Sequence, residues 1–323
     1  MPDAPVGVVL CNIGGPASAD VATIRRYLRR FFADPVILPV HPVARWFLSR
    51  RIAAKRAPES AKMYAAIGGK SPILEWTERQ ARGLEERLAA RGACRFVCAV
   101  AMRYSPPSVG EALAKLEAAG CREVVALPLY PQESRATTGS SLAELDRALA
   151  GRPSLRKRGA IRDFADHAGY VGAVAERIEE ALAAFPDRGR VRVLFSAHGL
   201  PKRFVDDGDP YAKRVAATID GVRGHLNGPI SWSLAYQSRA TREPWLGPET
   251  AEKIEELALR GVKELLVVPV SFVSDHVETL YEIGVLFEKH AREKGIERFA
   301  YTRGLNDSPR FLDALADLVL SVK

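Results

Sequence analysis

Two segments of the chain carry side chains that can bind a metal or move protons. The first reads FSAHGLP over residues 195–201, and its His198 comes directly after an apolar run and before a glycine. A neutral imidazole can accept a proton near pH 7 or bind a transition metal, so this position suits either chemistry. The alternative is a histidine that only hydrogen-bonds its own turn.

The second segment reads SFVSDHVETLYE over residues 271–282 and also follows an apolar run. In a helix, Glu278 and Glu282 are like charges four residues apart, which costs about 0.2–0.5 kcal/mol unless a cation binds them. Such a cluster can pass a hydrated divalent ion inward. The alternative is a capping box, in which Asp275 accepts from the third helical amide and Glu278 reaches back. The residues of this segment that can bind a metal or carry a proton are Asp275, His276, Glu278 and Glu282.

A third stretch supplies groups that bind carboxylates. Lys55 and Arg56 are followed by Tyr64 and by the turn GGKSP, which contains Ser71. Their cations, phenol and hydroxyl can hydrogen-bond an anionic ligand. An ordinary solvated basic loop is the alternative interpretation.

Residues 31–48 are apolar and aromatic, and Pro35, Pro39 and Pro42 interrupt them. Proline inside a helix removes a hydrogen bond and clashes with the preceding turn, so this segment cannot be one long helix. We interpret it as an exposed apolar lip, of the kind that marks a membrane contact or a ligand entrance. A strap packed on the core is the alternative.

Buried parallel strands are expected to position these groups, because short apolar runs alternate with amphipathic stretches along the chain. The runs are nearly continuous in apolar character, which is typical of parallel strands covered on both faces. This alternation predicts an α/β fold, whose ligands bind beyond the carboxyl ends of the strands. We expect strands at 6–10, 96–102, 124–129, 191–196, 230–236 and 265–271, and helices at 77–91, 109–119, 169–184 and 249–260.

A weak internal repeat predicts two similar Rossmann-like lobes with parallel sheets. VGVVLCNIGGP at 6–16 aligns with VRVLFSAHGLP at 191–201, and LEAAGCRE at 116–123 aligns with LALRGVKE at 257–264. The first alignment pairs Ile13 with His198, which suits a flat, largely apolar ligand in a cleft between the lobes. We expect lobes at 1–158 and 159–305, a linker in 151–159 and a closing helix in 306–323.

Composition and motifs exclude several classes of protein. Hydrophobic residues make up 47% of the 323 residues and charged residues 27%, which is ordinary globular composition. The net charge of +8 suits an anionic substrate or an acidic membrane surface, but no basic cluster with interleaved aromatics indicates nucleic acid. GxGxxG, GxxxxGK[ST] and GxSxG motifs are absent. Without a signal peptide or an 18-residue apolar run, we expect a cytoplasmic protein.

Taken together, these motifs resemble those of the ferrochelatases, which insert ferrous iron into a porphyrin. The resemblance implies two Rossmann-like lobes with the porphyrin between them, and a metal-inserting lyase of haem biosynthesis. The matching segments follow the family's order over nearly the whole chain: CNIGGP, IGGKSP, AMRYSPP, LPLYPQESRATTGSS, FSAHGLP, YQSRATREPWLGP and VSFVSDHVETLYE.

The same matching assigns roles to individual residues. His198 and Glu278 correspond to the family's iron ligands or proton-handling groups, and we expect His276 and Glu282 to extend Glu278 into an acidic relay. Ile13 falls where some relatives place methionine, opposite the histidine. The residues expected to line the porphyrin pocket are Ile13, Arg56, Tyr64, Ser71, Arg103, Tyr104 and Trp245, with Arg56 and Ser71 on a propionate.

The sequence departs from those family members that carry an iron–sulfur cluster. They use one cysteine between the PQ and TTGSS elements and three in a C-terminal extension, whereas here Arg135 occupies that loop and Cys121 is the last cysteine. We therefore expect no cluster and no tightly bound cofactor, with Fe²⁺ as a substrate. Without the extension, a monomer is favoured over the dimer of longer relatives.

The predicted reaction is insertion of Fe²⁺ into protoporphyrin IX, with release of two protons, as the last step of haem biosynthesis. Coproporphyrin III, which carries four carboxylates rather than two, is the alternative substrate, and the apolar lip favours protoporphyrin. A tetrapyrrole or metal carrier without turnover is the alternative from another class of protein. The lip is expected to touch the inner membrane peripherally and to guide the apolar substrate.

Overall fold

The computed structural model describes residues 4–92, 94–241 and 243–322, which form two compact units. The first unit comprises the chain up to Tyr130, Ser134–Arg162 and the residues from Leu315 onward, and the second comprises Pro131–Glu133 and Asp163–Ala314. The change of unit therefore falls at Arg162, four residues after the expected 158, because a strand in the expected linker belongs to the first sheet.

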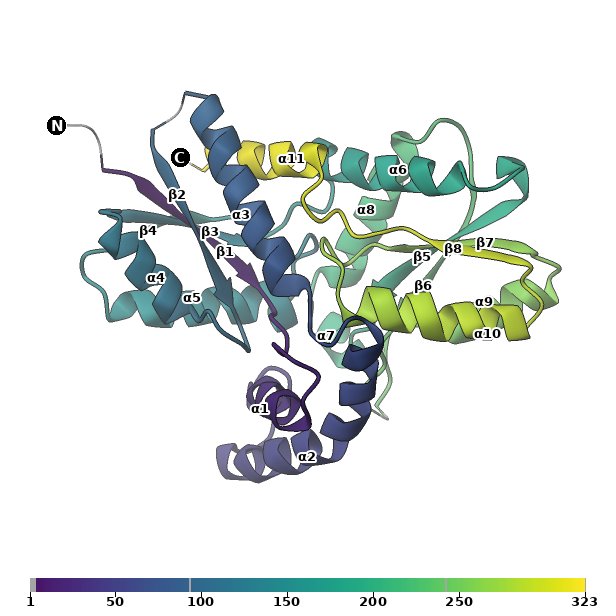
Figure 1. Ribbon diagram of the computed structural model, residues 1–323, viewed down its shortest axis with the longest axis horizontal. Helices are drawn as coiled ribbons and strands as arrows, with labels where there is room; N and C mark the ends of the chain where they lie inside the picture. Colours follow the sequence, from purple (N-terminus) through teal and green to yellow (C-terminus); the bar gives the residue numbers. More distant parts are fainter. Residues whose placement is uncertain (1–3, 93, 242, 323) are drawn as a thin grey trace. The chain divides into compact units, whose positions relative to one another are not determined.

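The first unit contains a parallel sheet in the order β2-β1-β3-β4 (Figure 1). Every residue of the central strand β1 is buried. Its odd-numbered side chains pack with α4 and α5, while on the other face Asn12 donates from Nδ2 to Thr77 Oγ1 of α3, at 3.1 Å. Both faces are covered, which explains the continuous apolar run. The bounds are β1 Val6–Asn12, β2 Phe96–Met102, β3 Glu123–Pro128, β4 Arg156–Ala160, α3 Ile73–Ala90, α4 Val109–Ala118 and α5 Ser140–Ala150, preceded by the π-helix η1 Arg135–Gly139.

The second unit repeats this order as β6-β5-β7-β8, again with all pairs parallel. One apolar core joins this sheet to α9, the π-helix η3 and α10, and α6 and α8 pack against each other. The matching strand orders confirm the α/β fold with two similar lobes. The bounds are β5 Val191–His198, β6 Ser231–Gln237, β7 Glu264–Pro269, β8 Arg298–Tyr301, α6 Ala168–Leu182, η2 Arg188–Arg190, α7 Lys202–Asp206, α8 Tyr211–Gly224, α9 Thr250–Leu259, η3 Glu278–Phe287 and α10 Glu288–Glu293. The last helix, α11 (Pro309–Leu320), belongs to the second unit up to Ala314 and to the first unit from Leu315.

The strands missed by the sequence analysis are the edge strands β4 and β8. The expected linker at 151–159 was wrong in this respect, since β4 reads RKRGA and its basic residues are exposed. Arg156 and Lys157 form ion pairs with Glu123 and Asp146 and do not pack into an apolar core. Edge strands need few apolar residues and often carry charges, so the apolar runs gave no signal here.

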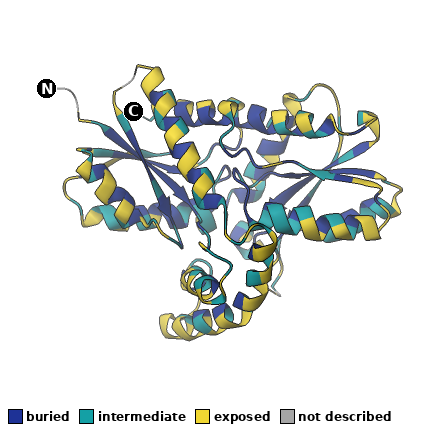
Figure 2. Ribbon diagram, viewed as in Figure 1, coloured by how far each residue is buried: buried dark blue, intermediate teal, exposed yellow. Residues whose placement is uncertain are grey.

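The apolar segment at 31–48 is divided between two helices that pack against each other, α1 (Val21–Phe32) and α2 (Pro42–Ala66). As the prolines predict, it is not one helix, and Pro42 begins α2 where its missing N–H costs nothing. Figure 2 shows the beginning of α2 as exposed, and there Val43, Trp46 and Phe47 are 51–62% exposed. The alternative of a solvated loop around Arg56 and Tyr64 was wrong, because both residues lie in α2.

The glycine in β1 is required by the helix packed against it. A Cβ at Gly7 would lie 2.6 Å from Leu116 Cδ1 of α4, in a fully buried layer. We expect Gly7→Ala to lower the free energy of unfolding by about 1–3 kcal/mol, the usual range for overpacking. Chemical denaturation measures this value.

A matched control lies in α4 itself. At Gly110 the nearest atom to an added Cβ is Ser108 Oγ at 3.9 Å. Gly110→Ala should therefore keep or raise stability, by up to about 1 kcal/mol, because alanine favours the helix. Equal effects of the two substitutions would contradict the packing argument.

Candidate active site

His198 is the last residue of the central strand of the second sheet, and its backbone is held from both sides. Its N–H donates to Ser271 Oγ at 3.2 Å, and its carbonyl accepts from the Tyr211 hydroxyl at 2.9 Å. The hydroxyls of Tyr211 and Ser271 are themselves 2.7 Å apart. The imidazole therefore projects from a fixed point at the carboxyl end of the sheet.

Glu278 begins the π-helix and contacts this imidazole. Its Oε2 lies 2.9 Å from His198 Nδ1, and the two side chains are 26% and 39% exposed. With Nδ1 directed at the carboxylate, Nε2 is the ring nitrogen left for a substrate or a metal. Short π-helical segments are common at functional sites.

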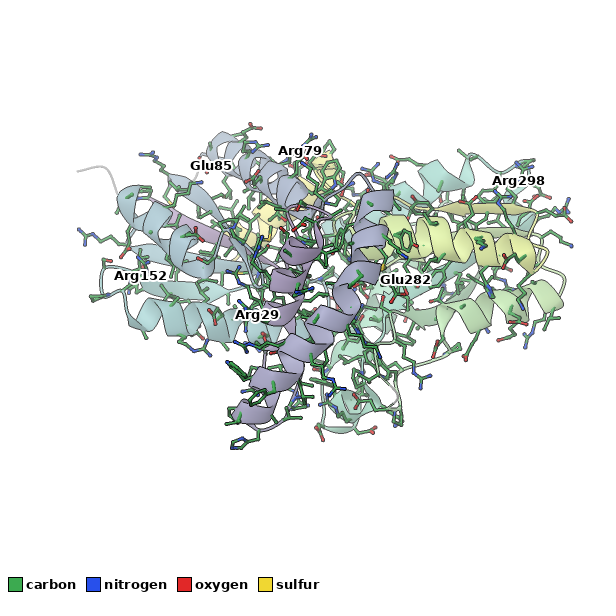
Figure 3. The ribbon with its side chains drawn as sticks, turned by 60° about the horizontal axis from the view of Figure 1, so that its bottom comes forward. Arg29, Arg79, Glu85, Arg152, Glu282 and Arg298 are labelled. Atoms are coloured by element: carbon green, nitrogen blue, oxygen red, sulfur yellow. The ribbon has the colours of Figure 1, made fainter. Side chains whose placement is uncertain are left out.

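Ser238 joins Glu278 to the second carboxylate of the cluster, Glu282 (labelled in Figure 3). Its hydroxyl lies 3.1 Å from Glu278 Oε2 and 2.6 Å from Glu282 Oε2, and its N–H donates to Glu282 Oε1 at 2.9 Å. Gln237 Nε2 adds a bond to Glu282 Oε2 at 3.1 Å. Ser238 has a φ of 65°, in the left-handed region that favours glycine, so the backbone accepts strain to place these donors.

The environment separates the protonation behaviour of the three groups. Burial disfavours the His198 cation, but the charge and hydrogen bond of Glu278 outweigh it and raise the pKa of His198. Burial likewise opposes ionisation of Glu278, but the charge and hydrogen bond of His198 hold its pKa well below its usual range. Burial and the charge of Glu278 raise the pKa of Glu282. Protonation of His198 therefore forms an ion pair with Glu278, beside a carboxyl group that keeps a proton more readily, which is the pattern of an acid–base relay.

Asp275 and His276, the other two candidate residues of this segment, are buried and contact the neighbouring loops. The capping-box alternative was wrong, because Asp275 accepts from Gly304 N and Asn306 Nδ2, both at 3.0 Å, and Glu278 points to His198. Asp275 therefore ties the 304–306 loop to the start of the π-helix. His276 lies against Phe272 and its pKa is lowered by burial, so this predicted relay member is neutral near pH 7.

Trp245 lies beside the turn that follows His198. A Cβ at Gly199 would lie 2.7 Å from the Gln237 carbonyl oxygen and 3.0 Å from the indole Cε3. The indole N–H donates to Thr241 Oγ1 at 2.9 Å. The glycine of the FSAHGLP segment thus leaves room for the half-buried Trp245 ring next to His198.

The predicted porphyrin-binding residues of the first unit gather after β1 and along α2. Ile13 follows β1 as His198 ends β5, and its carbonyl accepts from Tyr104 N at 3.1 Å. Ser71 N donates to Pro16 O at 3.0 Å. Arg56 lies over the Phe32 ring at 5.4 Å, and Tyr64 is 7% exposed.

Arg103 and Tyr104 follow β2, and both bind a buried carboxylate that the sequence analysis missed. Asp34 Oδ2 accepts from Arg103 Nη2 at 2.7 Å and from the Tyr104 hydroxyl at 2.8 Å. Tyr104 is only 4% exposed. No pattern around FADP indicated this contact, whereas Gln237 and Ser238 follow a predicted strand and could have been found from that position.

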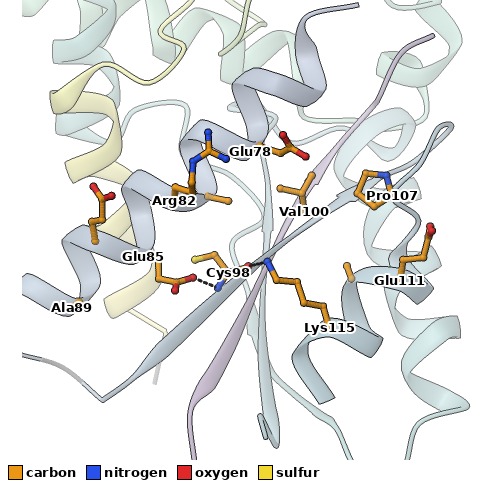
Figure 4. A pocket seen from close by; sticks show the side chains of 12 residues that line it. Glu78, Arg82, Glu85, Ala89, Cys98, Val100, Pro107, Glu111 and Lys115 are labelled. Atoms are coloured by element: carbon orange, nitrogen blue, oxygen red, sulfur yellow. Dashed lines mark hydrogen bonds between the residues drawn. The ribbon is translucent and has the colours of Figure 1, made fainter. Parts of the chain in front are cut away.

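A groove of about 780 Å³ runs along the edge strand β2, between α3 and α4 (Figure 4). Glu85 Oε2 accepts from Cys98 N at 2.8 Å, and Lys115 Nζ donates to Cys98 O at 3.0 Å. These side chains satisfy the outer backbone groups of an edge strand, which protects it from pairing with another chain. The described residues that line the groove include none of those predicted for chemistry.

In residues 4–92, 94–241 and 243–322, no three His, Cys, Asp or Glu side chains are grouped so as to hold a metal ion. The predicted iron ligands His198 and Glu278 are therefore a pair of donors in direct contact with each other.

The family model described as ferrochelatase matches residues 5–322. A ferrochelatase of Geotalea uraniireducens is 46% identical over 313 residues, covering 97% of this chain and 96% of the relative, and one of Synechocystis is 40% identical, covering 98% and 82%. The solved structure of SirB from Bacillus subtilis with Fe³⁺ matches with a TM-score of 0.55 at 17% identity, over 76% of this chain and 89% of that one.

The ion pair has a defined pH window. Its contribution to folding is lost as pH falls through the lowered pKa of Glu278 and as pH rises through the raised pKa of His198. We expect Glu278→Gln to lower the pKa of His198, because burial then opposes the cation with less compensation. NMR titration of the imidazole, assigned with His198→Asn, measures this shift.

Glu255→Gln is the control, since Glu255 pairs with Lys294 on the surface. It should leave the His198 titration unchanged. An unaltered His198 pKa in Glu278→Gln would show that the contact does not control the imidazole.

Proposed function

The chain belongs to the ferrochelatase family, and we propose that it inserts ferrous iron into protoporphyrin IX, forming protohaem and releasing two protons. The observation that carries this proposal is the contact of His198 Nδ1 with Glu278 Oε2 at 2.9 Å, beside a second carboxylate. Metal insertion must remove two pyrrole N–H protons, so the site needs a base and a path for protons. His198 is the proposed base, and Glu278 and Glu282 are the proposed path for protons.

In the proposed mechanism His198 Nε2 accepts a pyrrole proton while Nδ1–H donates to Glu278. The carboxylate stabilises the imidazolium as it forms, which is why the pKa of His198 is raised. Ser238 connects Glu278 to Glu282, whose raised pKa makes it the next group to hold a proton. Seating of the incoming iron by His198 and Glu278 is the alternative role, because the single Nε2 lone pair cannot hold the metal and the pyrrole proton at the same time.

The porphyrin is proposed to contact Ile13, Arg56, Tyr64, Ser71, Arg103 and Trp245. Ile13 offers an apolar side chain at the turn after β1. Ser71 packs against Gly15 of that turn, where an added Cβ would lie 2.3 Å from Ser71 Oγ. Arg56 supplies a cation for a propionate.

We also propose that the protein holds no iron–sulfur cluster. Cys11, Cys98 and Cys121 are buried, and burial raises the pKa of each thiol, to about 12 for Cys11. Clusters bind thiolates, so such thiols are poor ligands. A monomer in the cytoplasm, peripheral to the inner membrane, remains our expectation.

The lip is proposed to touch a membrane surface. Trp46 and Phe47 are exposed at the start of α2, with Arg50 3.5 Å over the Trp46 ring and Arg51 exposed nearby. On α1, Arg29 is exposed as well (Figure 3). An apolar patch with basic neighbours fits an anionic lipid surface. No helix in the described parts of the chain is long and apolar enough to cross a bilayer.

Anaerobic assays with Fe²⁺ and either protoporphyrin IX or coproporphyrin III test the reaction. We expect many turnovers with protoporphyrin, and His198→Ala and Glu278→Gln should each reduce turnover at least roughly 100-fold, the usual contribution of a positioned acid or base. Absorbance of the metalloporphyrin measures the rate.

His225→Ala is the matched control, because His225 is exposed at the end of α8 and bonds only its own helix. Near-normal turnover in both site variants would refute the assigned roles. A preference for coproporphyrin would change the substrate, and porphyrin binding without metal insertion would support the carrier.

Replacement of the exposed aromatics tests the lip. Trp46→Ser/Phe47→Ser should weaken binding to anionic vesicles at least about tenfold, because two large apolar side chains no longer enter the lipid. Vesicle co-sedimentation measures binding. Leu259→Ser is the control, since Leu259 is 83% exposed on α9, and equal losses in both variants would exclude a specific lip contact.

A further inference from the structure

We propose that Asp34 is a positioning residue, which holds Arg103 and Tyr104 in place at the end of β2 and so shapes the porphyrin-binding surface of the first unit. The inference rests on the proposed function, because the surface matters only if a porphyrin binds there. Asp34 itself does not touch the substrate, since its side chain is 1% exposed.

One carboxylate oxygen of Asp34 collects three donors. Asp34 Oδ2 accepts from Arg103 Nη2 at 2.7 Å and from the hydroxyls of Tyr104 and Ser140, both at 2.8 Å. Arg103 Nε also donates to Ser140 Oγ at 3.0 Å, which closes the network. A carboxylate this buried is tolerated only when it is paired and hydrogen-bonded, so each donor is held firmly.

The network connects three parts of the first unit. Asp34 lies between α1 and α2, Arg103 and Tyr104 follow β2, and Ser140 begins α5. The other oxygen, Asp34 Oδ1, accepts from Val36 N at 2.8 Å. Asp34, which belongs to the lip, therefore connects the lip to the carboxyl end of the sheet, where ligands of α/β folds bind.

The network also limits what Arg103 can do. Its Nη2 and Nε are engaged, and Nη1 lies 3.8 Å from Glu144. Two carboxylates thus already face this guanidinium, and its side chain is 18% exposed. The nitrogen that Arg103 offers to a substrate carboxylate is therefore Nη1. Asp34 sets the direction of this nitrogen because it holds the guanidinium through Nη2.

Replacement of Tyr104 distinguishes a residue that contacts the porphyrin directly from one that acts by positioning another residue. Its ring is buried and its hydroxyl donates to Asp34, so we expect loss of that hydroxyl to affect the porphyrin through Asp34 and Arg103. Asp34→Asn keeps the shape but removes the charge that pairs with Arg103. Both variants should therefore weaken porphyrin binding without touching the proton relay.

Porphyrin fluorescence titration without iron, together with steady-state kinetics, tests the proposal. We expect Asp34→Asn to raise the porphyrin Kd and KM about tenfold or more, with kcat within about twofold, since hydrogen bonds to charged groups are the stronger ones. Tyr104→Phe should raise Kd by a smaller factor, roughly threefold. In Asp34→Asn/Arg103→Gln the increase should be no larger than in the worse single variant, because coupled residues are not additive.

Asp20→Ala is the control for a loss of stability in the same helix pair. Asp20 caps α1 by accepting from Thr23 N at 2.9 Å and lies on the surface, so loss of this cap should lower the melting temperature without changing Kd. An unchanged Kd in Asp34→Asn and Tyr104→Phe, or a change in kcat alone, would overturn the positioning role. Binding without iron insertion by the unmodified protein would overturn the proposed function but not this one.

Discussion

The second unit is organised around two carboxylates that must coexist at the carboxyl end of a parallel sheet. Glu278 and Glu282 leave the same π-helix and share Ser238 as a hydrogen-bond donor. Water can solvate such a pair only partly here, so the protein supplies the imidazole of His198, the Ser238 N–H and the Gln237 amide instead. These groups come from the ends of β5 and β6 and from the residue that follows β6.

Parallel strands provide these donors because their carboxyl ends meet at one edge. His198 ends β5, and Gln237 ends β6, which is its neighbour in the sheet. The chain then turns through Ser238 with a positive φ, a conformation that costs a residue other than glycine about 1–3 kcal/mol. The strain is offset by two polar groups of one residue that reach both carboxylates. The regular sheet thus fixes the positions of His198 and Gln237, and the unusual backbone conformation of Ser238 directs its donors to the carboxylates.

Much of this arrangement could be predicted from the sequence, because it depends on local patterns. The apolar runs located six strands within two residues of their observed ends. The repeat between the segments around Ile13 and His198 predicted two similar lobes, which the equal strand orders confirm. The edge strand β4 and the π-helical form of residues 278–287 were not predictable, since neither has a distinct apolar period. Asp34 was missed for another reason, because its partners lie 69–106 residues away in the chain.

Asp34 and Glu278 show two different uses of a carboxylate with hydrogen-bond donors. Asp34 is buried, and an arginine and two hydroxyls bind one of its oxygens, so its charge is fully compensated and its partners are held still. Glu278 and His198 remain 26% and 39% exposed, and their neighbour Glu282 has a raised pKa. In the roles proposed above, the exposed pair handles protons and the buried carboxylate holds its partners in place. The difference in burial, rather than the type of residue, is the basis for giving the two carboxylates different roles.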